Sequence, residues 1–158
     1  MREMAVETRT RLMPRPIDEV WPVIEDFTTT YRWNPLVERS EPIGDQRVGL
    51  GAQRRCDLDD TGKKHIEERI VDFDADAHRY VVEIVGGTAK PPIRTQVEFV
   101  AEAAGAAATS VTMTAHLMAD SMFTRLIAPI GARQLGKVAD QVLEGLAGFL
   151  ENEARTTP

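Results

Sequence analysis

Residues 121–153 read SMFTRLIAPIGARQLGKVADQVLEGLAGFLENE, and they decide the fold because they form the longest amphipathic stretch of the chain. Apolar residues recur there in steps of three or four, or multiples of them, and this spacing predicts one long C-terminal helix. Its predicted buried stripe consists of Phe123, Ile127, Ile130, Val138, Val142, Leu146 and Phe149. Asp120 or Ser121 can cap the start, and we expect Pro129 to kink the helix or delay its start.

The region before this helix alternates short apolar runs with turn residues. Strands are predicted at 37–43, 52–58, 64–74, 79–85, 94–102 and 109–118. Connections this short favour an antiparallel meander. A further strand is predicted at 4–12, where alternation puts Met4, Val6, Thr8, Thr10 and Leu12 on one face. We expect Val6 and Thr8 to face the core, opposite the charged residues of the same strand.

Two short helices are expected between the first and second strands. The first covers 17–27, with Asp18 as its N-cap, and the threonines at 28–30 end it. The second is a helical turn at 31–35. A sheet with one apolar face needs a cover, and only the C-terminal helix is long enough to supply it. The order therefore predicts a single α+β domain over 1–158, with an ordered core of about 4–153: a curved seven-stranded antiparallel sheet around a long helix.

Four glycines interrupt the C-terminal helix, at 131, 136, 145 and 148. Each costs a helix up to about 1 kcal/mol relative to alanine. They indicate either close packing of the helix on the sheet or space left for a ligand.

Composition narrows the classes of function. The chain has 158 residues, 42% of them hydrophobic, and a net charge of -6, with a pI of about 5.1. These values allow a substantial core, and they disfavour binding to nucleic acid or attraction to an anionic membrane. No apolar run approaches the roughly 20 residues of a membrane helix, and no secretory signal is recognised, so we expect a cytoplasmic protein.

Metal and cofactor motifs are weak. Cys56 is the only cysteine, so no internal disulfide can form. The pattern Asp57-x-Asp59-x-Thr61-Gly62-x5-Glu68 nearly matches a calcium loop, but strands are predicted on both sides of it, so we interpret it as a tight turn. The three histidines fall on different elements. We expect neither a metal nor a cofactor.

Two charged residues are predicted to meet inside the sheet. Arg54 shares the less charged face of its strand with Cys56, and Glu68 shares a face with Ile66 and Ile70 on the next strand. Around the intervening turn, Arg54 falls opposite residue 67 or 68, and which glutamate faces inward is left open. An internal arginine can hold an oxyanion and an internal carboxylate can act as a general base. The alternative is a cross-strand ion pair without chemistry.

The sequence resembles the START-related helix-grip superfamily, also called SRPBCC or Bet v 1-like, and within it the polyketide cyclase/dehydrase-like branch. The residues that carry the resemblance are the stretch 17–27, Trp33-x-Pro35, Gly49-x-Gly51-x-x-Arg54, Asp60-x-Gly62, 67–70 and Arg79-Tyr80. Where related chains often carry a tryptophan in the penultimate element, this chain has Met113. The resemblance covers nearly the whole chain, and it is specific for fold and weak for function.

The resemblance implies a hydrophobic small molecule in an internal cavity: a lipid, an isoprenoid or a polycyclic aromatic or polyketide-like compound. Residues expected to bind it are Thr8, Trp33, Arg54, Cys56, Glu68, Ile70, Tyr80, Val82, Val97, Phe99, Met113, Ile127, Gln134 and Val138. One alternative is a polyketide cyclase or dehydratase, in which Arg54 holds an enolate and Glu68 or Tyr80 moves the proton. Another alternative is a regulatory or protein-interaction module. Beyond the ligand, we expect no nucleic-acid partner and no integral membrane segment, and the oligomeric state is not predicted.

Overall fold

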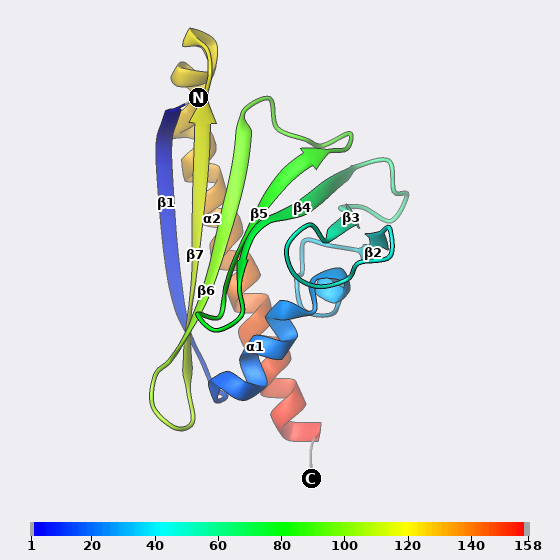
Figure 1. Ribbon diagram of the computed structural model, residues 1–158, viewed down its shortest axis with the longest axis vertical. Helices are drawn as coiled ribbons and strands as arrows, with labels where there is room; N and C mark the ends of the chain where they lie inside the picture. Colours follow the sequence, from blue (N-terminus) through cyan, green and yellow to red (C-terminus); the bar gives the residue numbers. More distant parts are fainter. Residues whose placement is uncertain (1, 157–158) are drawn as a thin grey trace.

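A computed structural model describes residues 2–156 of the chain, and the side chains of residues 6–153. Seven strands form one antiparallel sheet in the order β1-β7-β6-β5-β4-β3-β2. The sheet is curved, the long helix α2 lies along its concave side, and α1 closes the lower end in Figure 1. The elements in chain order are β1 (Arg2–Met13), α1 (Ile17–Glu25), the 3-10 helix η1 (Phe27–Arg32), β2 (Arg39–Ile43), β3 (Gln53–Asp57), β4 (His65–Asp74), β5 (Arg79–Gly86), β6 (Arg94–Ala103), β7 (Thr109–Ala119) and α2 (Met122–Thr156).

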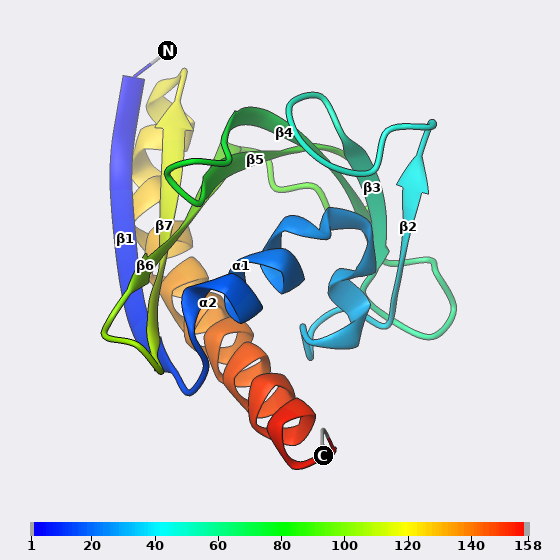
Figure 2. The same ribbon diagram turned by 60° about the horizontal axis from the view of Figure 1, so that its bottom comes forward.

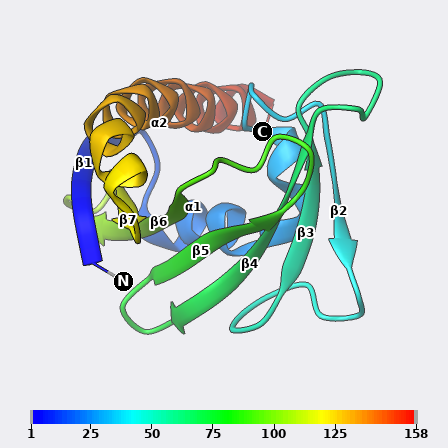
Figure 3. The same ribbon diagram turned by 90° about the horizontal axis from the view of Figure 1, so that it is seen from above.

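This architecture confirms the helix-grip fold that the order of elements predicts. Strands β2 to β7 form the expected meander, and β1 pairs with β7 and forms one edge of the sheet. Each predicted strand lies within a residue or two of its observed bounds. Seen from above, α2 lies on one side of the molecule and β3, β4 and β5 curve round the opposite side (Figure 3).

The predicted inward face of β1 is wrong. Val6 is exposed, and the hydroxyl of Thr8 is 3.3 Å from that of Thr114 on the outer face of the sheet. The register with β7 decides this orientation, because Arg9 lies opposite Met113, whose side chain is buried on the inner face. Arg9 therefore reaches toward α2, where its Nε donates a hydrogen bond to Asp140 at 3.3 Å.

The helical region after β1 also departs from the prediction. Helix α1 begins directly after Pro16, which serves as the N-cap without a side-chain hydrogen bond. Asp18 is therefore not the cap. It lies within the first turn, where its negative charge interacts favourably with the helix dipole. Helix α1 ends at Glu25, before the predicted end at Phe27, and the threonines at 28–30 lie within η1, where Thr29 has non-helical dihedrals (φ -106°, ψ 22°). Both short helices lie between β1 and β2 (Figure 2).

The start of α2 follows the predicted capping chemistry. The Oγ of Ser121 accepts a hydrogen bond from the backbone N–H of Thr124 at 3.2 Å, and the Thr124 hydroxyl accepts one from Asp120 N–H at 3.1 Å. Two backbone donors at the helix start are thereby satisfied. Pro129 does not delay the start, since α2 runs as one helix from Met122.

The predicted buried stripe of α2 is correct in its C-terminal half and wrong in its N-terminal half. Val142 and Leu146 are buried, but Phe123 and Ile130 are each 64% exposed. The residues that face the sheet near the start are smaller: Thr124, Ala128 and Ala132 are buried there.

Close approach of α2 to the sheet explains this difference. A Cβ placed on Gly131 would lie 3.1 Å from the Leu117 side chain, and one on Gly136 would lie 2.6 Å from the Arg9 guanidinium. The Leu117 side chain leaves little room beside Gly131, whereas the Arg9 guanidinium beside Gly136 is the end of a flexible side chain that can move. Of the two interpretations of the helix glycines, close packing therefore holds at Gly131.

The apolar core is divided into two clusters. The larger joins α1, the inner face of the sheet and the C-terminal half of α2, and it includes Trp21, Phe27 and Tyr80. The smaller contains Ile93, Leu117, Ala119, Ala128 and Ala132, and it holds the N-terminal half of α2 against β7 and the end of the β5–β6 loop. The first half of α2 is thus anchored mainly by small side chains.

Two glycines of α2 provide a matched test of this packing. Gly145→Ala places a Cβ 2.6 Å from the Trp33 carbonyl oxygen, so we expect it to lower the free energy of unfolding by about 1–3 kcal/mol. Gly148→Ala meets nothing within 4 Å, and we expect it to raise stability by about 0.5–1 kcal/mol. Urea unfolding of both variants measures the difference, and equal effects would contradict the packing described for Gly145.

Candidate functional site

A cavity of about 460 Å³ lies between the inner face of the sheet and α2. Aliphatic side chains form most of its wall, and Arg54, Glu68, Asn34 and Lys64 supply the polar groups. The lining residues are Asn34, Leu36, Val37, Arg54, Leu58, Lys64, Ile66, Glu68, Val82, Ile84, Ala89, Pro91, Val97, Phe99, Met113, Leu135, Val138 and Val142. This size and this lining are typical of sites for small apolar molecules.

Arg54 and Glu68 form an ion pair on the cavity wall. They lie directly opposite each other in the β3–β4 register, and they are only 5% and 7% exposed. The Arg54 Nε donates to Glu68 Oε1 at 2.9 Å, and Nη2 lies 2.8 Å from the same oxygen. The question of which glutamate faces inward is thus resolved in favour of Glu68.

The fold holds the Arg54 guanidinium from two further directions. Its Nη1 donates a hydrogen bond to the carbonyl oxygen of Phe27 at 2.8 Å, and its carbon lies 3.9 Å from the centre of the Phe27 ring. Phe27 begins η1, so this short helix places both its backbone and its ring against the charge. The carboxylate, the carbonyl oxygen and the aromatic face together replace the hydration that this cation loses when it is buried.

Burial and the charges of this pair shift the pKa values of Arg54 and of the neighbouring Cys56. Burial has the largest single effect and lowers the pKa of Arg54, but the charge and hydrogen bond of Glu68, together with contributions from Cys56 and Tyr80, raise it, so the net direction is upward. Burial raises the pKa of the neighbouring Cys56 thiol to about 12, and its Sγ lies 3.6 Å from Glu68 Oε1. Cys56 is therefore a neutral thiol at physiological pH and is poorly suited to nucleophilic chemistry.

Tyr80 belongs to the core beside the cavity and does not line it. Its hydroxyl donates to the carbonyl oxygen of Ile24 at 3.3 Å, and its ring lies 5.3 Å from that of Phe99 and 6.0 Å from that of Phe27. Burial raises the pKa of Tyr80 above its usual value. The hypothesis that Tyr80 moves a proton to a bound molecule therefore lacks support in the geometry.

Half of the ligand-binding residues expected from the sequence meet in the cavity wall: Arg54, Glu68, Val82, Val97, Phe99, Met113 and Val138. Cys56, Ile70 and Tyr80 are buried but lie outside this lining, and Trp33 borders a separate small cleft beside Phe149. Three of the residues expected to bind the ligand lie away from the cavity. Thr8 is on the outer face, Gln134 is exposed, and Ile127 is partly exposed and outside the lining.

The lining residues that sequence reasoning missed come mostly from loops. Leu36 and Val37 follow η1, and Ala89 and Pro91 lie in the β5–β6 loop. Their proximity to the sheet depends on how the loops fold back, which no periodic pattern reveals.

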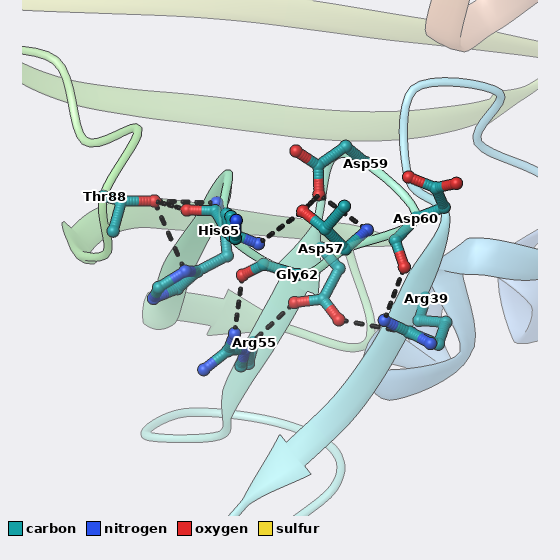
Figure 4. Close-up of polar contacts among 10 residues, drawn as sticks. Arg39, Arg55, Asp57, Asp59, Asp60, Gly62, His65 and Thr88 are labelled. Atoms are coloured by element: carbon teal, nitrogen blue, oxygen red, sulfur yellow. Dashed lines mark hydrogen bonds and ion pairs between the residues drawn. The ribbon is translucent and has the colours of Figure 1, made fainter.

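Hydrogen bonds fix the β5–β6 loop at the cavity. The Thr88 hydroxyl donates to the Lys63 carbonyl oxygen and accepts from the His65 backbone N–H (Figure 4). Gly87 has a φ of +102° and lies so close to the His65 backbone that a Cβ would clash with it. Ala89 and Pro91 are thereby held near the start of β4.

The calcium-like pattern does not form a cation site. Asp57 accepts hydrogen bonds from Arg55 at 2.9 Å and Arg39 at 3.3 Å, and these contacts, led by that of Arg55, lower its pKa (Figure 4). Asp59 instead closes the predicted turn by accepting from the Thr61 backbone N–H at 3.1 Å. Glu68 faces the cavity, away from this turn. Among the described residues, no group of three or more histidine, cysteine or acidic side chains could hold a metal ion.

Removing one member of the buried pair tests its energetic coupling. Arg54→Met leaves the Glu68 carboxylate buried without its cation, so we expect a loss of about 3–5 kcal/mol in the free energy of unfolding. The double variant Arg54→Met/Glu68→Leu removes both charges and should recover most of that loss. Chemical unfolding of both variants checks this, and additive losses in the double variant would refute the coupling.

A protein-family model matches nearly the whole chain. The family model described as polyketide cyclase/dehydrase and lipid transport matches residues 4–151. No curated protein matches the sequence. None of the helices in the described part of the chain is long and apolar enough to cross a membrane.

Several solved structures share the fold. A protein from Thermobifida fusca is 26% identical with a TM-score of 0.73, covering 94% of this chain and 95% of that chain. The Zhui aromatase/cyclase from Streptomyces sp. R1128 is 18% identical with a TM-score of 0.72, covering 96% of both chains. A norcoclaurine synthase from Thalictrum is 13% identical with a TM-score of 0.72, covering 95% of this chain and 96% of that chain. With the family match over nearly its whole length, the chain belongs to the polyketide cyclase/dehydrase and lipid transport family.

Proposed function

We propose that this protein binds a hydrophobic small molecule in the cavity between the sheet and α2. The observation that carries the proposal is an aliphatic cavity of about 460 Å³ with one buried ion pair on its wall. Burying apolar ligand surface there contributes roughly 25 cal/mol per Å². Lipids, isoprenoids and polycyclic aromatic or polyketide-like compounds all have this apolar character.

The ion pair supplies the polar selectivity of the proposed site. The contacts of Glu68 among the described residues all end on Oε1, so Oε2 is available to accept a hydrogen bond from a ligand. Arginine carries more N–H donors than Arg54 uses for Glu68 and Phe27. A ligand with a carbonyl or enol oxygen at one end and an apolar body suits this arrangement best.

A second candidate function is cyclisation or dehydration of a polyketide-like substrate. The presence of Arg54 and Glu68 on the cavity wall favours it, because a developing enolate oxygen can be stabilised by the guanidinium. Glu68 would then accept or return the proton. Two solved structures with this fold are described as an aromatase/cyclase and an ARO/CYC di-domain protein, at 18% identity each, which supports the fold and not the reaction.

Ligand binding is tested by filling the cavity from α2. Val138→Trp places a large ring among the lining residues, and we expect it to abolish binding of the apolar dye Nile red and of any lipid that copurifies with the protein. Gln134→Trp, one turn earlier and exposed, adds the same side chain outside the cavity and should leave binding intact. Fluorescence titration and mass spectrometry of extracted ligands provide the measurements. Unchanged binding in Val138→Trp would exclude this cavity as the site.

Catalysis is tested with Glu68→Gln, which keeps the shape and an acceptor oxygen but removes the base. For a cyclase, we expect the rate of poly-β-ketone cyclisation to fall by about 10²–10⁴-fold. Because the change also leaves Arg54 buried without its counter-charge, thermal stability should fall as well, so the two rates are compared at a temperature at which both forms are folded. A binding protein without catalysis would show no enzyme-dependent cyclisation in either form. The same rate in wild type and Glu68→Gln would remove Glu68 from the mechanism.

A further inference from the structure

The first turns of α2 expose an unusual amount of apolar surface. Met122 is 74% exposed, Leu126 71%, and Phe123 and Ile130 64% each. These four residues, which we call the apolar tip, follow one another at helical spacing on the side facing away from the sheet. A contiguous exposed apolar surface of this kind on a folded domain marks an interaction site.

The tip is not required by the packing of the helix. The inward side of these turns is filled by the buried residues Thr124, Ala128 and Ala132, and a Cβ on Gly131 would already lie 3.1 Å from the Leu117 side chain. The outward side is solvent-exposed and would accept polar residues without any loss of these core contacts. Large apolar residues at those positions therefore indicate a partner outside the fold.

Charge identifies the kind of partner. Between Ser121 and Ala139 every ionisable residue is a cation, namely Arg125, Arg133 and Lys137, although the whole chain carries a net charge of -6. All three are exposed, and Arg133 and Lys137 continue the line of Leu126 and Ile130 along the helix. The nearest acidic residues, Asp120 and Asp140, flank the segment, and Asp140 is bonded to Arg9.

We propose that the apolar tip and the three cations form a docking surface for an anionic lipid bilayer. Apolar side chains enter the boundary between headgroups and acyl chains, while Arg133 and Lys137 contact the lipid phosphates, as in interfacial amphipathic helices. A second copy of the chain fits less well, because the three cations beside the apolar tip would face their like-charged counterparts across a two-fold interface.

The position of this surface suits a protein with an internal apolar cavity. The start of α2 and the β5–β6 loop lie at the same end of the molecule, opposite α1 (Figure 1). Leu135 and Val138 of α2 and Pro91 of that loop line the cavity. The docking surface would therefore bring this end of the cavity to the bilayer, although binding to the bilayer does not depend on the cavity being occupied.

Vesicle co-sedimentation of the full chain tests the proposal. We expect binding to vesicles of mixed phosphatidylcholine and phosphatidylglycerol, weaker binding to pure phosphatidylcholine, and loss of binding at high salt.

Two variants and a matched control separate the contributions of the apolar tip and the cations. Leu126→Ser/Ile130→Ser should lower the partition coefficient about tenfold. Arg133→Glu/Lys137→Glu should lower it on anionic vesicles about tenfold or more. The matched control Leu12→Ser/Leu50→Ser removes two apolar residues that are each 62% exposed elsewhere, and it should bind like wild type.

Three results would overturn the proposal. The first is no binding of wild type to anionic vesicles at low salt, and the second is an equal loss of binding in the matched control. The third is concentration-dependent dimerisation in analytical ultracentrifugation that Leu126→Ser/Ile130→Ser abolishes, which would assign the apolar tip to a second copy of the chain. Nile red binding by the same variants separates these outcomes from any failure of the cavity itself.

Discussion

The close approach of α2 to one edge of the sheet is the constraint on which the rest of the structure depends. Among the strands, α2 packs against β1 and β7, where Gly131 and Gly136 leave room for Leu117 and Arg9. The curved sheet carries the backbone of β3, β4 and β5 away from the helix (Figure 3), and residues of these strands and of α2 line the cavity between them. Tight contact at one edge and separation at the other leave the cavity as a consequence of the fold.

The buried pair of Arg54 and Glu68 is the main exception to the apolar character of this interior. Removing two charges from water is unfavourable in free energy. Their mutual attraction offsets this loss only when their geometry is good and additional hydrogen bonds are made. Here the additional bond comes from the carbonyl of Phe27, and the Phe27 ring covers the guanidinium. Such a pair is weak evidence for stability, whereas its place on a cavity wall supports the proposal that it orients a ligand.

Net charge is a poor guide to the surface of this molecule. A value of -6 disfavours attraction to an anionic membrane when the chain is treated as a whole. The charge is unevenly distributed, however, because the turns of α2 that expose the apolar tip carry only cations. Electrostatic attraction at short range depends on this local arrangement, since salt screens the more distant acidic residues.

The sequence by itself determined the order of elements, the antiparallel meander and the opposition of Arg54 to the glutamates of β4. Each of these follows from local periodicity and short turns, which act between residues close together in the chain. It did not determine which face of β1 points inward, because both faces of that strand are partly polar and only the register with β7 puts Arg9 inside and Thr8 outside.

The outward direction of Phe123 and Ile130, the position of Tyr80 beside the cavity and the loop residues in its wall were likewise decided only by the tertiary structure. All three depend on distances between elements far apart in sequence, which helical or strand spacing does not encode. The sequence thus determined which elements form, and the packing of α2 against β1 and β7 determined where the interior is filled and where it is empty.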